Sequence, residues 1–385
     1  MAYTRPLALL LLWSSVVPVA ISAATPSCTD KPAVLRTVGY YDTSVAGTSC
    51  GIFPESIKVS GYTHINAAHA YINPTTFEVA FAKTKDPDIW RRLVALRDVN
   101  PGLKVWLSIG GWTMNNPGQP TQFTFNRLAG SGQQVQENFF NSLLAILGSY
   151  GFDGVDIDWQ YPGVRTQGGG ELDFLNYPAF LKNLRGYLDS SGFAYGVSIT
   201  YPGLQKYQSA FDVLAIEPWI DWFNVINYNL HCQNDTISSS TTAAHANIKD
   251  FDNAFAALWA QGIVPAKVTL GLGFYGRSYT LPSTQCRDIA CPASGFTNTG
   301  PCAANETGML SYDQIMDIVD SGAVPYTSSG VKMLVYDTVQ WVTYDDATTL
   351  GQKVQYANQH CLGGQCLLQI LCIITDRQQG PTSGL

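Results

Sequence analysis

Short apolar runs rich in β-branched and aromatic residues alternate along the chain with segments whose apolar residues recur at helical spacing. Eight such runs predict strands at residues 34–41, 63–72, 104–111, 154–159, 194–200, 222–229, 267–274 and 364–371. Helical stripes are predicted at residues 87–99, 134–150 and 172–188, and more weakly at 348–359. Strands that alternate with helices imply an α/β fold with a parallel sheet, and eight such units over roughly 360 residues predict a closed (β/α)8 TIM barrel. A doubly wound open sheet is the alternative.

One connection is too long for a simple barrel. Residues 277–331 follow the seventh predicted strand, whereas a βα connection usually takes about 2–6 residues plus one helix. This stretch contains Cys286, Cys291 and Cys302 among many Gly, Pro and Thr residues. We therefore expect a small disulfide-containing insertion after strand seven, at about 278–331, on the rim formed by the carboxyl ends of the strands. No internal repeat divides the chain, so residues 24–385 are predicted to form one barrel domain.

The first residues of the chain predict export. Arg5 precedes an apolar run from residue 7 to 19, and small residues follow up to Ala24. This pattern is typical of a secretory signal peptide, here residues 1–23, with a signal anchor as the alternative. All nine cysteines come later and are expected to form disulfides, and their odd number leaves at least one thiol free or paired between chains. Glycosylation sequons at Asn234 and Asn305 also fit a secreted, extracellular protein.

Composition narrows the range of partners. Only 13% of the residues are charged, against about 25% in typical soluble proteins, and 12% are aromatic. The net charge of −7 and the lack of a basic run argue against nucleic acid and anionic membranes as partners. A charge-poor, aromatic-rich chain suits a neutral, stackable ligand such as a carbohydrate. Since the five histidines are scattered and no CxxC pair occurs, we expect no metal site. We also expect no cofactor and a monomeric protein.

The acidic segment at residues 152–162 is the strongest candidate for chemistry. Strand alternation places Asp156, Asp158 and Gln160 on one face, while the residues between them form an apolar face suited to packing against helices. Charges directed into a barrel are costly unless they are used, and these lie toward the carboxyl end of a strand, where barrel active sites occur. The alternative is a buried polar network that only fixes the barrel.

This segment carries a family resemblance. The pattern Asp153-x-x-Asp156-x-Asp158-x-Gln160 resembles the DxxDxDxE signature of family 18 glycoside hydrolases, the chitinases. Residues 104–112 resemble that family's SxGG strand, and further similar segments, at 39–41, 62–66, 271–277 and 341–345, follow in the same order. The resemblance covers about residues 35 to 375 and is of the fungal class V type, in particular its catalytically degenerate, chitin-sequestering members. It implies the same (β/α)8 barrel.

The resemblance also implies roles for individual residues. In this family hydrolysis is substrate-assisted: a Glu protonates the glycosidic oxygen, and the substrate's own N-acetyl carbonyl attacks the anomeric carbon. Carried over by position, Asp158 holds the acetamide, Asp156 is its buried neighbour, Tyr228 supports the carbonyl and Arg277 lies next to the sugar. The acid position is Gln160, and an amide has no proton to give, which typically costs 10²–10⁴-fold in rate.

Other positions of the expected sugar site also depart from the family pattern. Leu368 stands where the family has a Trp that floors the central sugar, and Asn229 stands where the family has an Asp after the tyrosine. On the second strand, residues 66–69 read Asn-Ala-Ala-His in place of Asn-Phe-Ala-Phe. Tyr40 and Trp112 remain to stack on or hydrogen-bond sugars, with core packing as the alternative for both.

Together these residues predict a secreted, non-catalytic lectin that binds chitin oligosaccharides without hydrolysing them. By resemblance, its purpose would be to hide chitin fragments from host immune receptors. Two alternatives remain open: a weakly active chitinase that cleaves β-1,4-linked N-acetylglucosamine by the retaining, substrate-assisted route, and an inhibitor that binds another protein on the same barrel.

Overall fold

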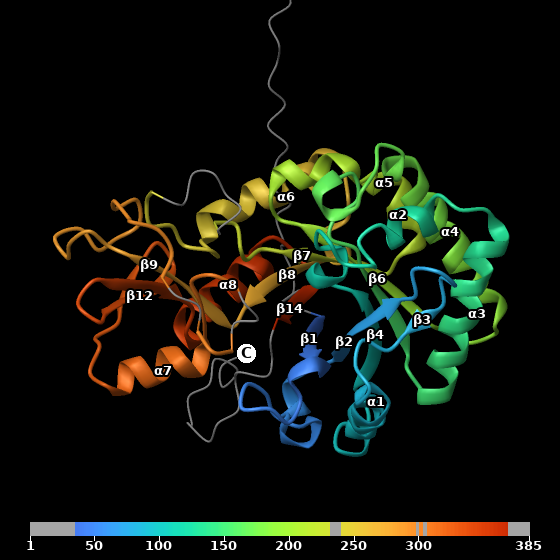
Figure 1. The fold of residues 1–385 in the computed structure, drawn as a ribbon, viewed down its shortest axis with the longest axis horizontal. Coiled ribbons are helices and arrows are strands. Elements are labelled where there is room, and N and C mark those ends of the chain that lie inside the picture. The colour runs from blue at the N-terminus through green and yellow to red at the C-terminus, as the bar shows by residue number, and fades with distance from the viewer. Residues whose placement is uncertain (1–34, 232–239, 298–299, 303–305, 369–385) are drawn as a thin grey trace, which may run out of the picture.

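Eight parallel strands close into a barrel in the computed structural model, which describes residues 35–231, 240–297, 300–302 and 306–368 (Figure 1). Neighbouring strands follow the order β1-β14-β8-β7-β6-β5-β4-β2, and β2 pairs in turn with β1. The barrel strands are β1 Arg36–Asp42, β2 His64–Ile72, β4 Lys104–Gly110, β5 Gly154–Asp158, β6 Gly196–Pro202, β7 Trp222–Ile226, β8 Val268–Gly273 and β14 Gly364–Leu368. The predicted TIM barrel is therefore confirmed, and the open sheet is wrong.

Helices cover the outside of the barrel in the ribbon of Figure 1. They are α1 Asp86–Ala95, α2 Thr124–Ala129, α3 Gln133–Tyr150, α4 Asp173–Ser190, α5 Val213–Ile216, α6 Phe251–Ala260 and α8 Ala347–Gln359. The predicted stripe on α3 buries Phe139, Leu143 and Leu147, and the left-handed Gly151 (φ 79°) ends that helix. Short 3₁₀ helices occupy loops at Thr43–Val45, Pro54–Ser56, Val59–Gly61, Leu96–Asp98, Trp112–Asn115, Arg165–Gln167, Gln205–Ala210, Glu217–Trp219, Ile248–Asp250 and Pro265–Lys267.

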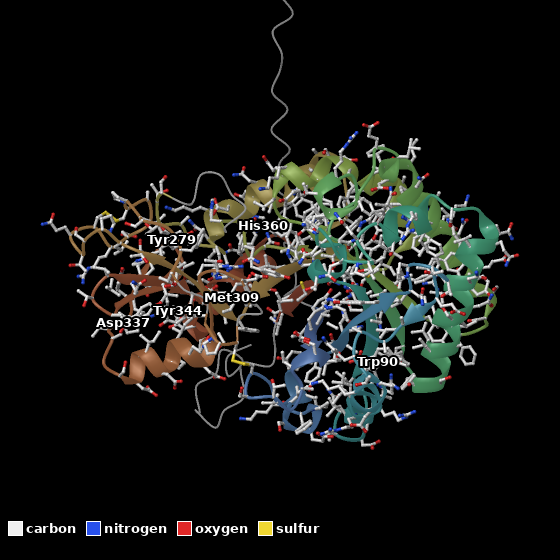
Figure 2. All side chains as sticks on the ribbon, in the orientation of Figure 1. Trp90, Tyr279, Met309, Asp337, Tyr344 and His360 are labelled. Carbon is white, nitrogen blue, oxygen red and sulfur yellow. A yellow bond between two sulfur atoms is a disulfide. The ribbon has the colours of Figure 1, made fainter. Side chains whose placement is uncertain are left out.

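An antiparallel sheet forms the insertion between β8 and β14. Its strand order is β10-β9-β13-β12-β11, from β9 Tyr275–Thr280, β10 Met309–Ser311, β11 Tyr326–Ser328, β12 Val331–Tyr336 and β13 Gln340–Tyr344. Helix α7, Tyr312–Asp320, starts at a capping box made by Ser311 and Gln314 and packs Ile315 under the sheet. The strands begin at Tyr275 and end at Tyr344, beyond both ends of the range 278–331. Figure 2 shows Tyr279 and Tyr344 in this unit, on the opposite side of the molecule from Trp90 on α1.

Two disulfides stabilise the insertion. Cys286–Cys291 closes a short loop within it, and Cys50–Cys302 ties it to the loop after β1. Cys366, on β14, is a free and buried thiol, and burial raises its pKa to about 12. The short strand β3, Val79–Ala80, pairs antiparallel with the end of β2.

The amino ends of the strands are closed by an aromatic plug, defined here as His64, Trp106 and Trp222. The two indoles stack with ring centroids 4.3 Å apart, and the imidazole meets each of them edge-on. Gly154 and Gly196 leave room for this stack, because a Cβ at these positions would lie 2.7 and 2.1 Å from Trp106. Access to the barrel interior is therefore left to the opposite, carboxyl end.

The predicted signal peptide and both sequons' asparagines lie outside the described residues. Among the helices of the described ranges, none combines the length and the apolar character that crossing a membrane needs.

Candidate functional site

A cavity of about 710 Å³ opens at the carboxyl ends of the barrel strands. Eight of the nine predicted site residues line it: Tyr40, Trp112, Asp158, Gln160, Tyr228, Asn229, Arg277 and Leu368. The ninth, Asp156, lies fully buried beneath the cavity and reaches it through Tyr40. The structure thus brings together residues from β1, β5 and β14, from the loops after β4 and β7, and from the insertion.

Asp156 is the centre of a buried hydrogen-bond network. Its Oδ2 accepts bonds from the hydroxyls of Tyr40 (2.9 Å) and Ser108 (2.7 Å), and its Oδ1 accepts from Ser198 Oγ (2.7 Å) and Asn224 Nδ2 (3.0 Å). Burial and the nearby charge of Asp158 raise the pKa of Asp156, while the hydroxyl donors partly offset them. Every donor comes from a different strand, so this carboxyl group fixes the relative positions of the strands that carry the site.

Asp158 points toward the cavity and has two side-chain partners. The amide Nε2 of Gln160 donates to its Oδ1 at 2.8 Å, and Nε2 of His69 lies 2.9 Å from its Oδ2. The carboxylate is only 5% exposed. A glutamine held as a donor to Asp158 orients that carboxylate, but it supplies no acidic proton to a ligand.

His69 is a site residue that the sequence analysis did not identify. Burial by itself lowers the pKa of its imidazole, but the hydrogen bond and charge of Asp158, with smaller contributions from Asp42 and Asp156, raise it above the usual value. The ring lies against Gly111 (φ 79°), where a Cβ would come within 2.8 Å of it. The only signal in the sequence was the departure from the family pattern on the second strand, to which no role was assigned.

Aromatic side chains form one wall of the cavity. Trp112 meets Tyr161 edge-on with centroids 6.4 Å apart, and Tyr161 stacks on Tyr207 at 4.9 Å. Tyr161 and Tyr207 were not predicted as site residues. Leu368, at the position where the family resemblance predicts a tryptophan, lines the cavity and packs, like Tyr228, against Tyr275 and Met309. The wall thus presents aromatic faces to the cavity, while Leu368 contributes an aliphatic side chain.

Arg277 and Asn229 form a fixed pair at the border between barrel and insertion. The guanidinium donates twice to Asn229 Oδ1, from Nε at 3.0 Å and from Nη2 at 2.7 Å, and it also forms an ion pair with Glu306. Arg277 is 2% exposed, so its charge is held by these partners rather than by water. Glu306, which also lines the cavity, was not predicted as a site residue.

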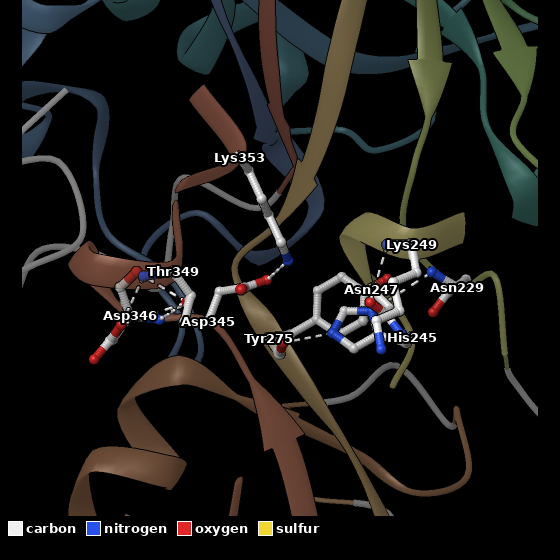
Figure 3. Close-up of polar contacts among 9 residues, drawn as sticks. All are labelled: Asn229, His245, Asn247, Lys249, Tyr275, Asp345, Asp346, Thr349 and Lys353. Atoms are coloured by element: carbon white, nitrogen blue, oxygen red, sulfur yellow. Dashed lines mark hydrogen bonds and ion pairs between the residues drawn. The ribbon is translucent and has the colours of Figure 1, made fainter. Parts of the chain in front are cut away.

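Buried residues behind this pair hold Asn229 in place (Figure 3). The backbone N–H of Asn229 donates to Nδ1 of His245 at 3.5 Å, and Nε2 of His245 lies 3.2 Å from the carbonyl of Tyr275. These partners require the neutral tautomer with its proton on Nε2. Burial and the charge of Arg277 lower the pKa of His245 well below its usual value, which keeps the ring neutral. Figure 3 also shows the buried ion pair of Lys353 with Asp345 nearby.

Two tyrosines that line the cavity, Tyr40 and Tyr228, are hydrogen-bond groups rather than acids. Burial raises the pKa of both Tyr40 and Tyr228 well above the usual value, and nearby charged and titratable groups add to it. Within the described ranges, no cluster of three or more His, Cys, Asp or Glu side chains is placed to hold a metal ion. The cavity offers neutral hydroxyls and aromatic faces beside the carboxylates and basic side chains that line it, a combination suited to a polar ligand that also presents apolar faces.

Comparison with known proteins places the chain in one family. The model for glycosyl hydrolases family 18 matches residues 36–369, so the chain belongs to that family. Chitotriosidase-1 of Mus musculus is 27% identical over 335 residues, which cover 81% of this chain and 67% of that protein. A class V chitinase of Arabidopsis thaliana is 27% identical over 320 residues, covering 80% of this chain and 79% of that protein.

Among solved structures, a family 18 chitinase of Cycas revoluta superposes with a TM-score of 0.73 at 27% identity, covering 86% of this chain and 94% of that one. That structure is of a double mutant, one of whose changes replaces a glutamate with glutamine, in complex with (GlcNAc)4.

Proposed function

We propose that this protein binds chitin oligosaccharides in the carboxyl-end cavity without hydrolysing them. The observation that carries the proposal is the amide of Gln160, which donates to Asp158 at the position where the family signature has its acid. The Cycas revoluta structure supports the binding part of the proposal, because a family member with a glutamate changed to glutamine is in complex with (GlcNAc)4.

The proposed binding mode uses the groups in the cavity. Asp158 accepts the N–H of the ligand's acetamide, and the hydroxyl of Tyr228 donates to its carbonyl. Sugar rings lie against the wall of Trp112, Tyr161 and Tyr207, whose faces supply apolar contact. Without a proton donor, the leaving oxygen stays unprotonated and the glycosidic bond stays intact.

Weak chitinase activity is the second candidate. Asp156 and Asp158 keep their buried arrangement, and Tyr228 is in place, so the parts that would hold and activate the N-acetyl group are present. The relative from Arabidopsis thaliana is a class V chitinase. In this case a slow reaction would proceed with water as the proton source.

We further propose that the protein is secreted and acts as an effector that sequesters chitin fragments from host receptors. The apolar run with small residues at positions 1–23 supports export, as do the disulfides Cys50–Cys302 and Cys286–Cys291, because disulfides persist in oxidising compartments.

Calorimetric titration with a chitin hexamer, paired with an assay for released sugars, tests the function. We expect saturable binding by the wild-type protein, a loss of at least about tenfold in affinity for Asp158→Ala, and no released sugar. Turnover comparable to that of a chitinase assayed in parallel would favour the enzyme. No binding of the hexamer by folded protein would contradict both carbohydrate functions.

A further inference from the structure

The side-chain partners of Asp158 differ in charge. Gln160 is neutral, whereas His69, whose side chain is 24% exposed, carries a positive charge when protonated. Its ring nitrogen Nε2 lies 2.9 Å from Oδ2 of a carboxylate that is only 5% exposed, so the protonated ring forms a close ion pair with Asp158 at the wall of the cavity. A ligand group that approaches Asp158 must therefore approach His69 as well.

The surroundings favour the charged form of His69. Asp42 on β1 and both Asp156 and Asp158 on β5 are the acids that act on it, and together with the hydrogen bond to Asp158 they outweigh the effect of burial. The other basic side chains that line the cavity are Lys83 and Arg277, and Arg277 is held by Asn229 and Glu306. His69 is thus the cation that balances this carboxylate.

We infer that His69 is a specificity-determining residue, which as an imidazolium paired with Asp158 admits the neutral acetamide of N-acetylglucosamine and excludes the ammonium of glucosamine. This inference rests on the proposed function, since it assigns selectivity to the same site. A neutral N–H donor can share Asp158 with His69 at no electrostatic cost. An ammonium brought to the same carboxylate is repelled by the imidazolium, and it gains little because the negative charge is already paired.

Without the imidazolium, the site would have the opposite preference. Asp158 and Asp156 would then present acidic groups with only neutral donors, within a protein of net charge −7. Such a cavity attracts a cationic oligosaccharide. The histidine on β2, where the family has an aromatic residue, removes that attraction.

The test compares affinities for N-acetylglucosamine and glucosamine hexamers by calorimetry at pH 5.5, where the amine and His69 are both protonated, and at 0.15 M salt. His69→Gln keeps an N–H donor but removes the charge. We expect the preference of the wild-type protein for the acetylated hexamer to fall about tenfold, mainly because the glucosamine hexamer binds more tightly. His231→Gln is the matched control: it breaks another His–Asp pair, with Asp250, that does not line the cavity. It should leave the preference unchanged.

The outcomes separate this inference from the proposed function. If the wild-type protein binds neither hexamer, the proposed function fails. If it binds the acetylated hexamer and His69→Gln keeps the preference within twofold, the role of His69 is wrong while the proposed function stands. Should His69→Gln not fold, His69→Phe restores the aromatic type of residue expected at this position and must show the same fall in preference.

Discussion

Strand β2 carries one histidine at each end of the barrel, and the two have opposite electrostatic character. His64 belongs to the aromatic plug, where burial and the charge of Arg36 lower its pKa to about 4. His69 lies five residues further along, beside Asp158, and its pKa is raised. The same residue type on one strand therefore has a lowered pKa at the amino end and a raised pKa at the carboxyl end.

This difference reflects the separate roles of the two ends of the barrel. The amino end packs two stacked indoles around a half-buried imidazole whose pKa is lowered. The carboxyl end holds charges that are paired but still line a cavity. Substitutions at the amino end should therefore change stability and leave ligand binding intact, whereas substitutions at the carboxyl end should do the reverse.

The largest expected effect concerns turnover at the carboxyl end. We predict that kcat/KM on a fluorogenic chitin oligomer is at least 10²–10⁴-fold below that of an active class V chitinase, because Gln160 supplies no proton. Gln160→Glu alone should restore little, since Leu368 still lies on the floor, and the double change with Leu368→Trp should exceed the product of the single effects. Ordinary chitinase rates for Gln160→Glu alone would show that Leu368 is not a functional loss.

The next effect concerns stability at the amino end. Trp106→Ala removes a large, nearly fully buried ring from the aromatic plug and should lower the free energy of unfolding by about 3–5 kcal/mol. Chemical denaturation measures this loss, and calorimetry on the folded variant should show hexamer affinity within twofold of the wild-type value. A large loss of affinity in the folded variant would show that the two ends are coupled.

The sequence predicted the barrel well because strand alternation and helical stripes are local signals. Its eight predicted strands all occur, with shifts at some ends, as for the strand predicted at 194–200 and found at Gly196–Pro202. The acidic cluster was also accessible, since Asp156 and Asp158 lie on one strand and share one face by alternation. The strand pattern and the acidic cluster are both properties of short segments, so they can be predicted without knowing which strands are neighbours in the barrel.

The role of His69 could not be predicted in this way because β4 separates β2 from β5. The contact with Asp158 passes across the end of β4, where Gly110 and Gly111 carry no side chains that would block it. Glu306 was also beyond reach, because its pairing with Arg277 depends on how the insertion folds back onto the barrel. Such contacts follow from tertiary geometry, for which a single sequence carries no direct signal.

A third prediction tests the neutral state of His64 at the amino end. Its folded-state pKa of about 4 lies below the unfolded value of about 6.5, so the folded form resists protonation and its contribution to stability is present above pH 6.5 and lost as the pH falls toward 4. Between pH 7 and pH 4 the wild-type protein should therefore lose about 3 kcal/mol of unfolding free energy relative to His64→Phe. A pH-independent difference would mean that the ring is not held neutral.

The smallest expected effect is the pH dependence of stability that His69 contributes, and its sign should be opposite to that of His64. Because Asp158 raises the pKa of this group above its unfolded value, its contribution to stability is complete below about pH 6.5 and is lost as the pH rises through the folded-state pKa. The wild type should therefore lose stability relative to His69→Phe between pH 5.5 and pH 8.5, by on the order of 1 kcal/mol, since part of the imidazole remains in solvent. Measuring above pH 5.5 keeps exposed carboxylates ionised throughout, and His231→Phe provides the matched His–Asp control at the surface. If stability changes with pH in the same direction for the His64 and His69 comparisons, the electrostatic difference between the two ends is wrong. Only an imidazolium stabilised by Asp158 makes the folded protein lose stability as the pH rises.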